Sequence, residues 1–130
     1  MINKYNGIMK LLGNIIWIIF GGFAIALEYC TMAIAFCATI IGIPFGFQLL
    51  KLALLSLLPF GQEPTYRENE PGCINTIFNI IWIFTGGILI ALTHLMFGIV
   101  LCITIVGIPF AMQHFKLMKL AFTPFGCNVV

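Results

Sequence analysis

The chain has 130 residues, of which 62% are hydrophobic and 8% charged, and its formal net charge is +2 at pH 7. Soluble domains average roughly 45–50% apolar and about 25% charged residues, so this composition excludes an ordinary soluble domain and indicates a membrane protein. The two long runs with few charges are each long enough for two spans of about 20 residues. No cluster of Lys or Arg indicates nucleic-acid binding, and the basic residues are better interpreted as topology signals.

An internal duplication organises the chain. Residues 14–61 align with residues 79–126 at a constant offset of 65 without a gap, and 25 of the 48 aligned positions are identical. Such self-similarity predicts two structural repeats. The segment between them carries three of the four acidic residues, two prolines and a glycine, which predicts a solvated linker. We therefore expect a first hairpin repeat at 1–61, a cytoplasmic linker at 62–73 and a second hairpin repeat at 74–130.

Each repeat contains two apolar segments, which predict a helical hairpin. In the first repeat the most polar interruption is Glu28-Tyr29-Cys30-Thr31, which predicts a tight turn between spans at about 11–27 and 32–50. The second repeat gives spans at about 76–92 and 97–115. Helices are expected because unpaired backbone groups in lipid each cost several kcal/mol. The alternative is one long span over 14–36 with Glu28 inside it, followed by an interfacial helix.

The positive charges predict the topology. In the hairpin arrangement all six Lys and Arg lie on one side, and neither turn carries any. By the positive-inside rule, both termini and the linker are expected in the cytoplasm. Because each repeat would cross the membrane twice, we expect parallel repeats, related by an axis along the membrane normal. The expected fold class is an all-α membrane protein with four transmembrane helices in two tandem hairpins.

The tetrapeptide Gly-Ile-Pro-Phe occurs once in the second span of each repeat and predicts a helix break. A proline leaves the carbonyl four residues upstream without its helical hydrogen bond, and a glycine permits a bend. One interpretation is a broken helix that exposes carbonyls to an ion or hinges a gate, and the other is a packing kink. A short interfacial helix is expected to follow each kink. The hinge residues would be Gly42, Pro44, Phe45, Gly107, Pro109 and Phe110.

Polar side chains matched between the repeats are the candidates for function. Asn14 and Asn79 are expected in interhelical polar pairs with the nearby glutamines, and such bonds typically contribute about 0.6 kcal/mol in membranes. The alternative is that the glutamines and lysines line a cytoplasmic vestibule, where lysines favour anions. The pore or vestibule candidates are Thr39, Gln48, Lys51, Thr104, Gln113 and Lys116.

Small and aromatic residues predict how the helices pack. Glycine pairs followed by alanine four residues later permit close helix approach. Trp17 and Trp82 fit an aromatic belt at the membrane surface. Glu28 and His94 are expected in solvated outer turns, because they lie in or near the polar interruptions. The packing glycines are Gly21, Gly22, Gly86 and Gly87.

No catalytic constellation is present in the sequence. There is no serine-histidine-acid set, no pair of carboxylates within the spans, no phosphate-binding glycine loop and no HExxH motif. The five cysteines have no metal-ligand spacing. We therefore expect neither an enzyme nor a bound metal or cofactor.

The duplicated pattern Asn-Ile-Ile-Trp, Gly-Gly, Thr-Ile-Ile/Val-Gly-Ile-Pro-Phe, Gln, Lys-Leu and Pro-Phe-Gly resembles the YccF family of small bacterial inner-membrane proteins, whose inner membrane component domain occurs in tandem. The resemblance extends over residues 14–126. It implies a multi-pass protein of the bacterial cytoplasmic (inner) membrane with two spans per domain and cytoplasmic flanks. It transfers no catalytic or binding residues.

These observations favour a small oligomeric channel or transporter for ions or small solutes, and the lysines tilt the expected solute towards anions. The alternative is a non-conducting accessory or scaffold subunit of another membrane complex. We expect a homo-oligomer in contact with membrane lipid, with an ion or small solute as ligand or a membrane protein as partner, and no nucleic acid. If Gln48 and Lys51 were sealed within one subunit or faced lipid, the channel interpretation would be weakened.

Overall fold

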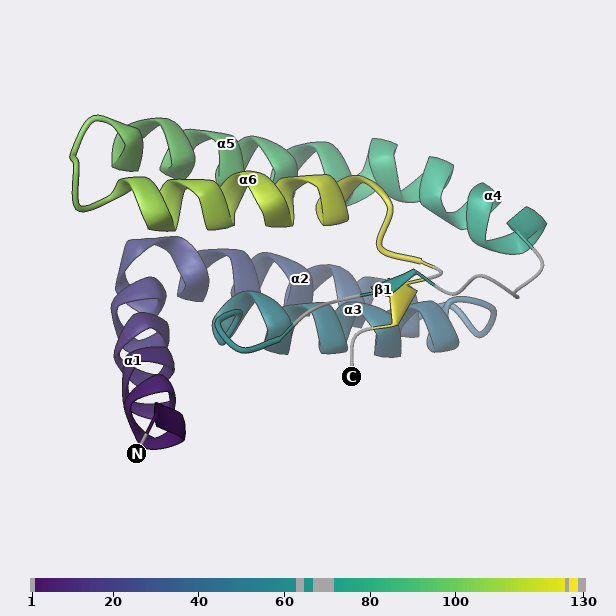
Figure 1. Cartoon of the computed structure of the whole chain (residues 1–130). Helices are drawn as coiled ribbons and strands as arrows, with labels where there is room; N and C mark the ends of the chain where they lie inside the picture. The colour runs from purple at the N-terminus through teal and green to yellow at the C-terminus, as the bar shows by residue number, and fades with distance from the viewer. Residues whose placement is uncertain (1, 63–64, 67–71, 126, 129–130) are drawn as a thin grey trace.

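The computed structural model describes residues 2–62, 65–66, 72–125 and 127–128, and nearly all of them are helical (Figure 1). Each repeat has three α-helices, and a short π-helical segment joins the first two. The first repeat contains α1 (Ile2–Trp17), η1 (Ile18–Gly22), α2 (Phe23–Cys37) and α3 (Ile43–Leu57). The second contains α4 (Gly72–Trp82), η2 (Ile83–Gly87), α5 (Ile88–Cys102) and α6 (Ile108–Phe122). Strands β1 (Thr65–Tyr66) and β2 (Cys127–Asn128) pair antiparallel.

The turn of each hairpin lies immediately before the Gly-Ile-Pro-Phe tetrapeptide. In the first repeat the Thr39 hydroxyl donates to the Phe36 carbonyl at 2.8 Å and accepts from the Gly42 amide at 3.1 Å. Pro44 then lies in the first turn of α3, where its missing N–H removes no helical bond. The tetrapeptide therefore begins a helix, and the expected kink inside a longer span is wrong.

The expected turn at Glu28-Tyr29-Cys30-Thr31 is also wrong, because α2 runs through these residues without interruption. The polar groups find partners inside the helical structure, except that Glu28 Oε2 is buried without a hydrogen-bond partner among the described residues. The Thr31 hydroxyl donates to the Leu27 carbonyl one turn earlier at 2.9 Å, and a Glu28 carboxylate oxygen accepts from the Thr93 hydroxyl of the other repeat at 2.8 Å. The structure has the helical stretch of the alternative interpretation, with Glu28 inside it, but this stretch is broken by non-helical backbone angles at Phe20 and Gly21.

Two stretches of helix are long and apolar enough to cross a membrane. They cover Asn6–Cys37, with mean hydropathy 1.9, and Asn75–Cys102, with mean hydropathy 2.1. By contrast, α3 and α6 have 15 residues each, or about 22 Å of helix, against a hydrocarbon core of about 30 Å. The expectation of four full transmembrane helices is therefore not confirmed.

Each repeat has a buried tryptophan at its centre. Trp17 and Trp82 are both fully buried, so their expected place in an aromatic belt is wrong. The Trp17 indole N–H donates to the Ser56 carbonyl at 2.6 Å, and the Trp82 indole N–H donates to the Ala121 carbonyl at 2.7 Å. A Cβ on Gly22 would lie 2.4 Å from the Trp17 ring. The glycine thus makes room for the indole and for the backbone of α3.

The two hairpins pack against each other in opposite directions. Gly21 faces Phe97 and Gly86 faces Met32, while the equivalent positions Glu28 and Thr93 touch each other. Such pairing requires α2 and α5 to be antiparallel around a local two-fold axis, and Figure 1 shows the two hairpin turns at opposite ends of the bundle. The expectation of parallel repeats is wrong, since it relied on a turn at residues 28–31.

The helix of the first repeat bends sharply where that of the second does not. Gly21 has φ 122° and Phe20 has ψ 35°, and α1 leaves α2 at a steep angle (Figure 1). The side chains of His114 and Phe97 occupy the space where a Cβ of Gly21 would lie, each 2.9 Å away. Gly86, the equivalent glycine, has no positive φ, and α4 continues into α5 with a mild bend.

This difference predicts unequal effects of alanine at two equivalent glycines. Gly21→Ala should destabilise the protein by more than about 1 kcal/mol, because its φ is positive and its Cβ would press on two packed rings. Gly86→Ala should cost less, since its Cβ would meet the flexible Met32 side chain at 3.0 Å. Thermal unfolding of both variants in detergent measures the difference. Equal losses would show that the bend at Gly21 does not require glycine.

Candidate functional site

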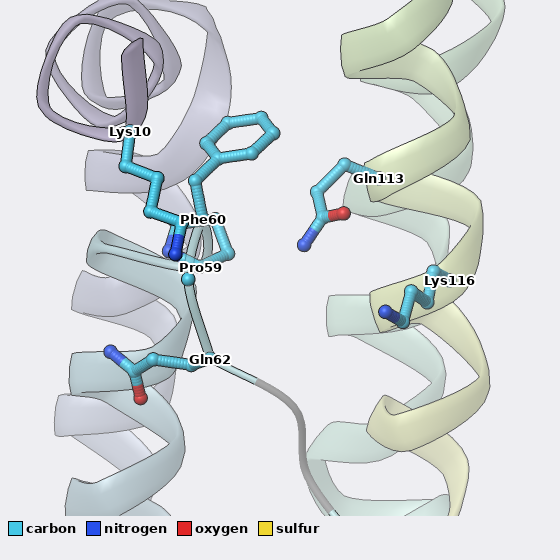
Figure 2. A pocket seen from close by; sticks show the side chains of 7 residues that line it. Lys10, Pro59, Phe60, Gln62, Gln113 and Lys116 are labelled. Carbon is cyan, nitrogen blue, oxygen red and sulfur yellow. The ribbon is translucent and has the colours of Figure 1, made fainter. Parts of the chain in front are cut away.

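A cationic pocket lies between the two repeats, where α1 and the end of α3 approach α6. Its volume is about 440 Å³, within the roughly 300–1,000 Å³ range of small-molecule sites. Figure 2 shows Gln113 and Lys116 on α6 directing their polar ends towards the loop that carries Pro59 and Phe60. The pocket residues are Lys10, Pro59, Phe60, Gly61, Gln62, Gln113 and Lys116.

Asn14 holds the loop that forms one wall of the pocket. Its side-chain amide donates to the Phe60 carbonyl at 3.3 Å, and its carbonyl oxygen accepts from the Phe60 amide at 2.9 Å. Gly61 then turns the chain with φ 95°, a conformation that favours glycine. Asn79 makes the same two bonds to Phe125, at 3.1 and 3.0 Å. Both asparagines therefore pair with backbone groups, where the sequence suggested glutamine partners.

The pocket concentrates positive charge. Lys10 from α1 and Lys116 from α6 both line it, and both side chains are exposed. Among the residues whose side chains the structure describes, Glu28 is the only acid, and it bonds to Thr93 of α5. The Gln113 amide adds neutral hydrogen-bonding capacity, whereas the Gln62 amide donates to the Leu58 carbonyl at 2.8 Å. The arrangement is chemically suited to a small anion or an anionic group.

The equivalent place in the other half of the molecule is built differently. Gln48, the counterpart of Gln113, donates its side-chain amide to the Pro124 carbonyl at 3.0 Å. Lys51 corresponds to Lys116 and is exposed, but the residue that corresponds to Lys10 is Asn75. Among the described residues, the equivalent region therefore lacks the second lysine. Gln48 is half-buried and its amide is held by a carbonyl of the same chain, which speaks against a vestibule that uses both glutamines equally.

The turn residues expected to line a pathway have structural partners. Thr104 repeats the bonding of Thr39, with its hydroxyl donating to Leu101 at 3.0 Å and accepting from Gly107 at 3.1 Å. The Ile40 carbonyl, four residues before Pro44, lies in the turn and accepts from the Ile43 amide at 3.4 Å.

Each threonine thus caps a turn. Both are exposed, whereas Gly42 and Gly107 are buried.

The aromatic residues of the tetrapeptides pack between helices. Phe45 stacks on Phe78 with ring centroids 3.6 Å apart, and Phe110 meets Phe60 edge-on at 5.6 Å. Pro44 and Pro109 lie in the first turns of α3 and α6. The tetrapeptides therefore lie at helix starts. Phe110 contacts Phe60, which lines the cationic pocket.

A pair of buried histidines lies next to the bend in the first repeat. The Nδ1 atoms of His94 and His114 are 3.0 Å apart, and His114 Nε2 lies 3.1 Å from the Phe20 carbonyl. Since a carbonyl only accepts, His114 donates from Nε2 and its Nδ1 accepts from His94 when both rings are neutral. His94 Nε2 then has no partner among the described residues. His94 is fully buried, so its expected place in a solvated turn is wrong.

The equivalent positions of the other half carry no histidine. Tyr29 and Leu49 correspond to His94 and His114, and both are buried near Trp82. On the other side the His114 ring lies on Trp17, with centroids 4.0 Å apart. No local pattern in the sequence indicates this pair, because its members lie on different helices 20 residues apart.

A double-mutant cycle on the histidine pair tests this bond. His114→Leu should cost about 1–3 kcal/mol because it leaves His94 Nδ1 buried without an acceptor. His94→Leu together with His114→Leu should recover part of that loss, since both partners are replaced by apolar groups. Unfolding in detergent gives the free energies. Strictly additive losses would contradict a direct bond between the rings.

Comparison with known proteins identifies relatives of the chain. The model of a family described as YccF, inner membrane component domain, matches residues 12–62 and 77–127, which confirms the tandem duplication. The inner membrane protein YccF of Escherichia coli (strain K12) is 32% identical over 130 residues, covering 94% of this chain and 88% of the relative. The protein of the same description from Shigella flexneri matches equally. No solved structure matches the chain.

Proposed function

We propose that this chain, which belongs to the YccF family of inner membrane component proteins, is a small channel or transporter that carries small anions across the bacterial inner membrane. The observation that carries the proposal is the pocket that Lys10 and Lys116 line from different repeats. Cationic side chains that line a cavity raise the local concentration of anions and favour their passage. The proposal assigns no enzymatic activity and no cofactor.

A conducting path in this proposal requires several copies of the chain. Each copy supplies two long apolar helices, while α3 and α6 extend only about 22 Å. Walls from neighbouring copies would complete a pathway of about 30 Å that begins at the cationic pocket. The proposed protein is therefore a homo-oligomer in which the lysine pocket of each copy opens towards the pathway.

The second candidate is a non-conducting accessory or scaffold subunit. The hairpin turns favour it, because their branched apolar side chains have no covering residues in the described chain. Ile40 is 87% exposed, and Ile105 and Val106 are 86% and 83% exposed. Exposed apolar patches mark surfaces that bind a membrane or another protein. In this case the turns would pack against a partner membrane protein.

The proposed topology places both termini and the linker in the cytoplasm. The two hairpin turns lie at opposite ends of the bundle, so the proposal rests on the basic residues of the N-terminal segment and the linker, Lys4, Lys10 and Arg67. The pairing of β1 with β2 supports a common side for the linker and the C-terminal segment, because it aligns Thr65 with Asn128 and Tyr66 with Cys127.

Anion flux through liposomes tests the transport proposal. Wild-type protein should release an entrapped small anion faster than protein-free liposomes do. Lys116→Gln should lower the flux roughly tenfold, which corresponds to one charge-assisted contact of about 1.4 kcal/mol. Lys51→Gln is the matched control, since Lys51 is the equivalent residue outside the pocket. No flux from a monodisperse wild-type protein would favour the accessory subunit.

Labelling of one native cysteine tests the topology. With the other four cysteines replaced by alanine, Cys127 should react with a membrane-impermeant maleimide in inverted vesicles and stay unlabelled in intact spheroplasts. Reaction in spheroplasts would place the C-terminus outside the cytoplasm and contradict the proposed orientation.

A further inference from the structure

An apolar groove lies beside the cationic pocket. It has a volume of about 450 Å³ and is formed by the end of α1, η1, α5, the turn after α5 and the start of α6. Its walls are almost entirely hydrocarbon. The residues that the argument uses are Ile16, Phe20, Val100, Val106 and Phe110.

The groove and the cationic pocket share one aromatic wall. Phe60 lines the pocket, Phe110 lines the groove, and their rings meet edge-on with centroids 5.6 Å apart. The same two helices, α1 and α6, contribute to both cavities. The anionic end of an amphipathic ligand would therefore bind in the pocket and its hydrocarbon tail in the groove, on opposite sides of the Phe60 and Phe110 rings.

The groove also remains open to the surroundings of the protein. Val106 is 83% exposed, Val100 is 58% exposed and Phe20 is 46% exposed. In a membrane protein such a surface meets lipid chains, and basic pockets between membrane helices bind anionic lipid head groups. Two lysines beside an acyl-sized groove match an anionic lipid in both charge and polarity.

We infer that the pocket and the groove together bind one anionic glycerophospholipid. Its phosphate lies between Lys10 and Lys116, beside the Gln113 amide, and one acyl chain follows the groove past Phe110. The inference rests on the pocket of the proposed function and names the anionic group that occupies it. The lipid would complete the wall of the pathway between α1 and α6.

The equivalent region of the other half lacks the features that form this site. In the other half of the molecule Asn75 replaces the second lysine, and the Gln48 amide is held by the Pro124 carbonyl. The expected stoichiometry is one tightly held anionic lipid per chain.

Native mass spectrometry of the full-length protein in detergent tests the site. The probes are phosphatidylglycerol, phosphatidylcholine with the same acyl chains, and inorganic phosphate. Wild-type protein should retain one phosphatidylglycerol at least roughly tenfold more tightly than phosphatidylcholine. Lys10→Gln with Lys116→Gln should abolish that preference, whereas Lys51→Gln should keep it.

A second pair of variants tests the tail. Val106→Trp fills the groove at an exposed position and should weaken binding of both lipids about tenfold. Ile41→Trp is its control, because Ile41 is the equivalent residue of the first turn and is 76% exposed. It should leave lipid binding unchanged.

Several outcomes would overturn the inference. Equal retention of the two lipids would show that the site does not select an anionic head group. Phosphate binding as tight as lipid binding, together with no effect of Val106→Trp, would assign the pocket to a free anion. Tighter lipid binding after Glu63, Glu68 and Glu70 are all changed to glutamine would show that a linker carboxylate is the natural occupant.

The two proposals fail in different ways. Flux that persists in a protein with no lipid preference would overturn the lipid site and leave transport standing. Selective lipid retention without flux in any liposome would overturn transport and leave the lipid site standing.

Discussion

The indole hydrogen bond of each buried tryptophan is the interaction on which the rest of the structure depends. Trp17 and Trp82 reach across their repeats to the last turns of α3 and α6, at Ser56 and Ala121. A buried indole N–H without an acceptor carries a desolvation penalty of about 1–3 kcal/mol, so the carbonyls must stay in register. Because Gly22 and Gly87 have no Cβ, the rings fit against the helices. The same register fixes the loops that begin at Pro59 and Pro124.

The duplication and the membrane class could be predicted from the sequence because they are properties of composition and self-similarity. The position of the hairpin turn could not. Glu28 and Thr31 interrupt an apolar run, and hydropathy treats them as exposed, although one bonds to Thr93 and the other to its own helix. The true turn surrounds Ile40 and Ile41, which are apolar, and only Thr39 and Gly42 carry its chemistry. Glu28 has its hydrogen-bond partner, Thr93, in the other repeat, and a local sequence pattern does not report such a long-range contact.

The candidate site was predictable only in part for the same reason. Gln113 and Lys116 were identified because they repeat Gln48 and Lys51, and both line the pocket. Lys10 was missed because its counterpart is Asn75, so repetition gave it no weight. Its place opposite Lys116 follows from the antiparallel packing of the repeats. The histidine pair was missed on the same grounds, since Tyr29 and Leu49 stand at the equivalent positions.

The differences between the repeats explain why a symmetric duplication produces one pocket. The backbone at Gly21 adopts φ 122° under the rings of His114 and Phe97, and α1 leaves α2 at a steep angle there. Trp17 then lies on the His114 ring, and Lys10, two turns earlier, lines a cavity with Lys116. At Gly86 the helix continues with only a mild bend, and Asn75 stands at the position that corresponds to Lys10. The sharp bend at Gly21 therefore accompanies the one pocket that a lysine of each repeat lines.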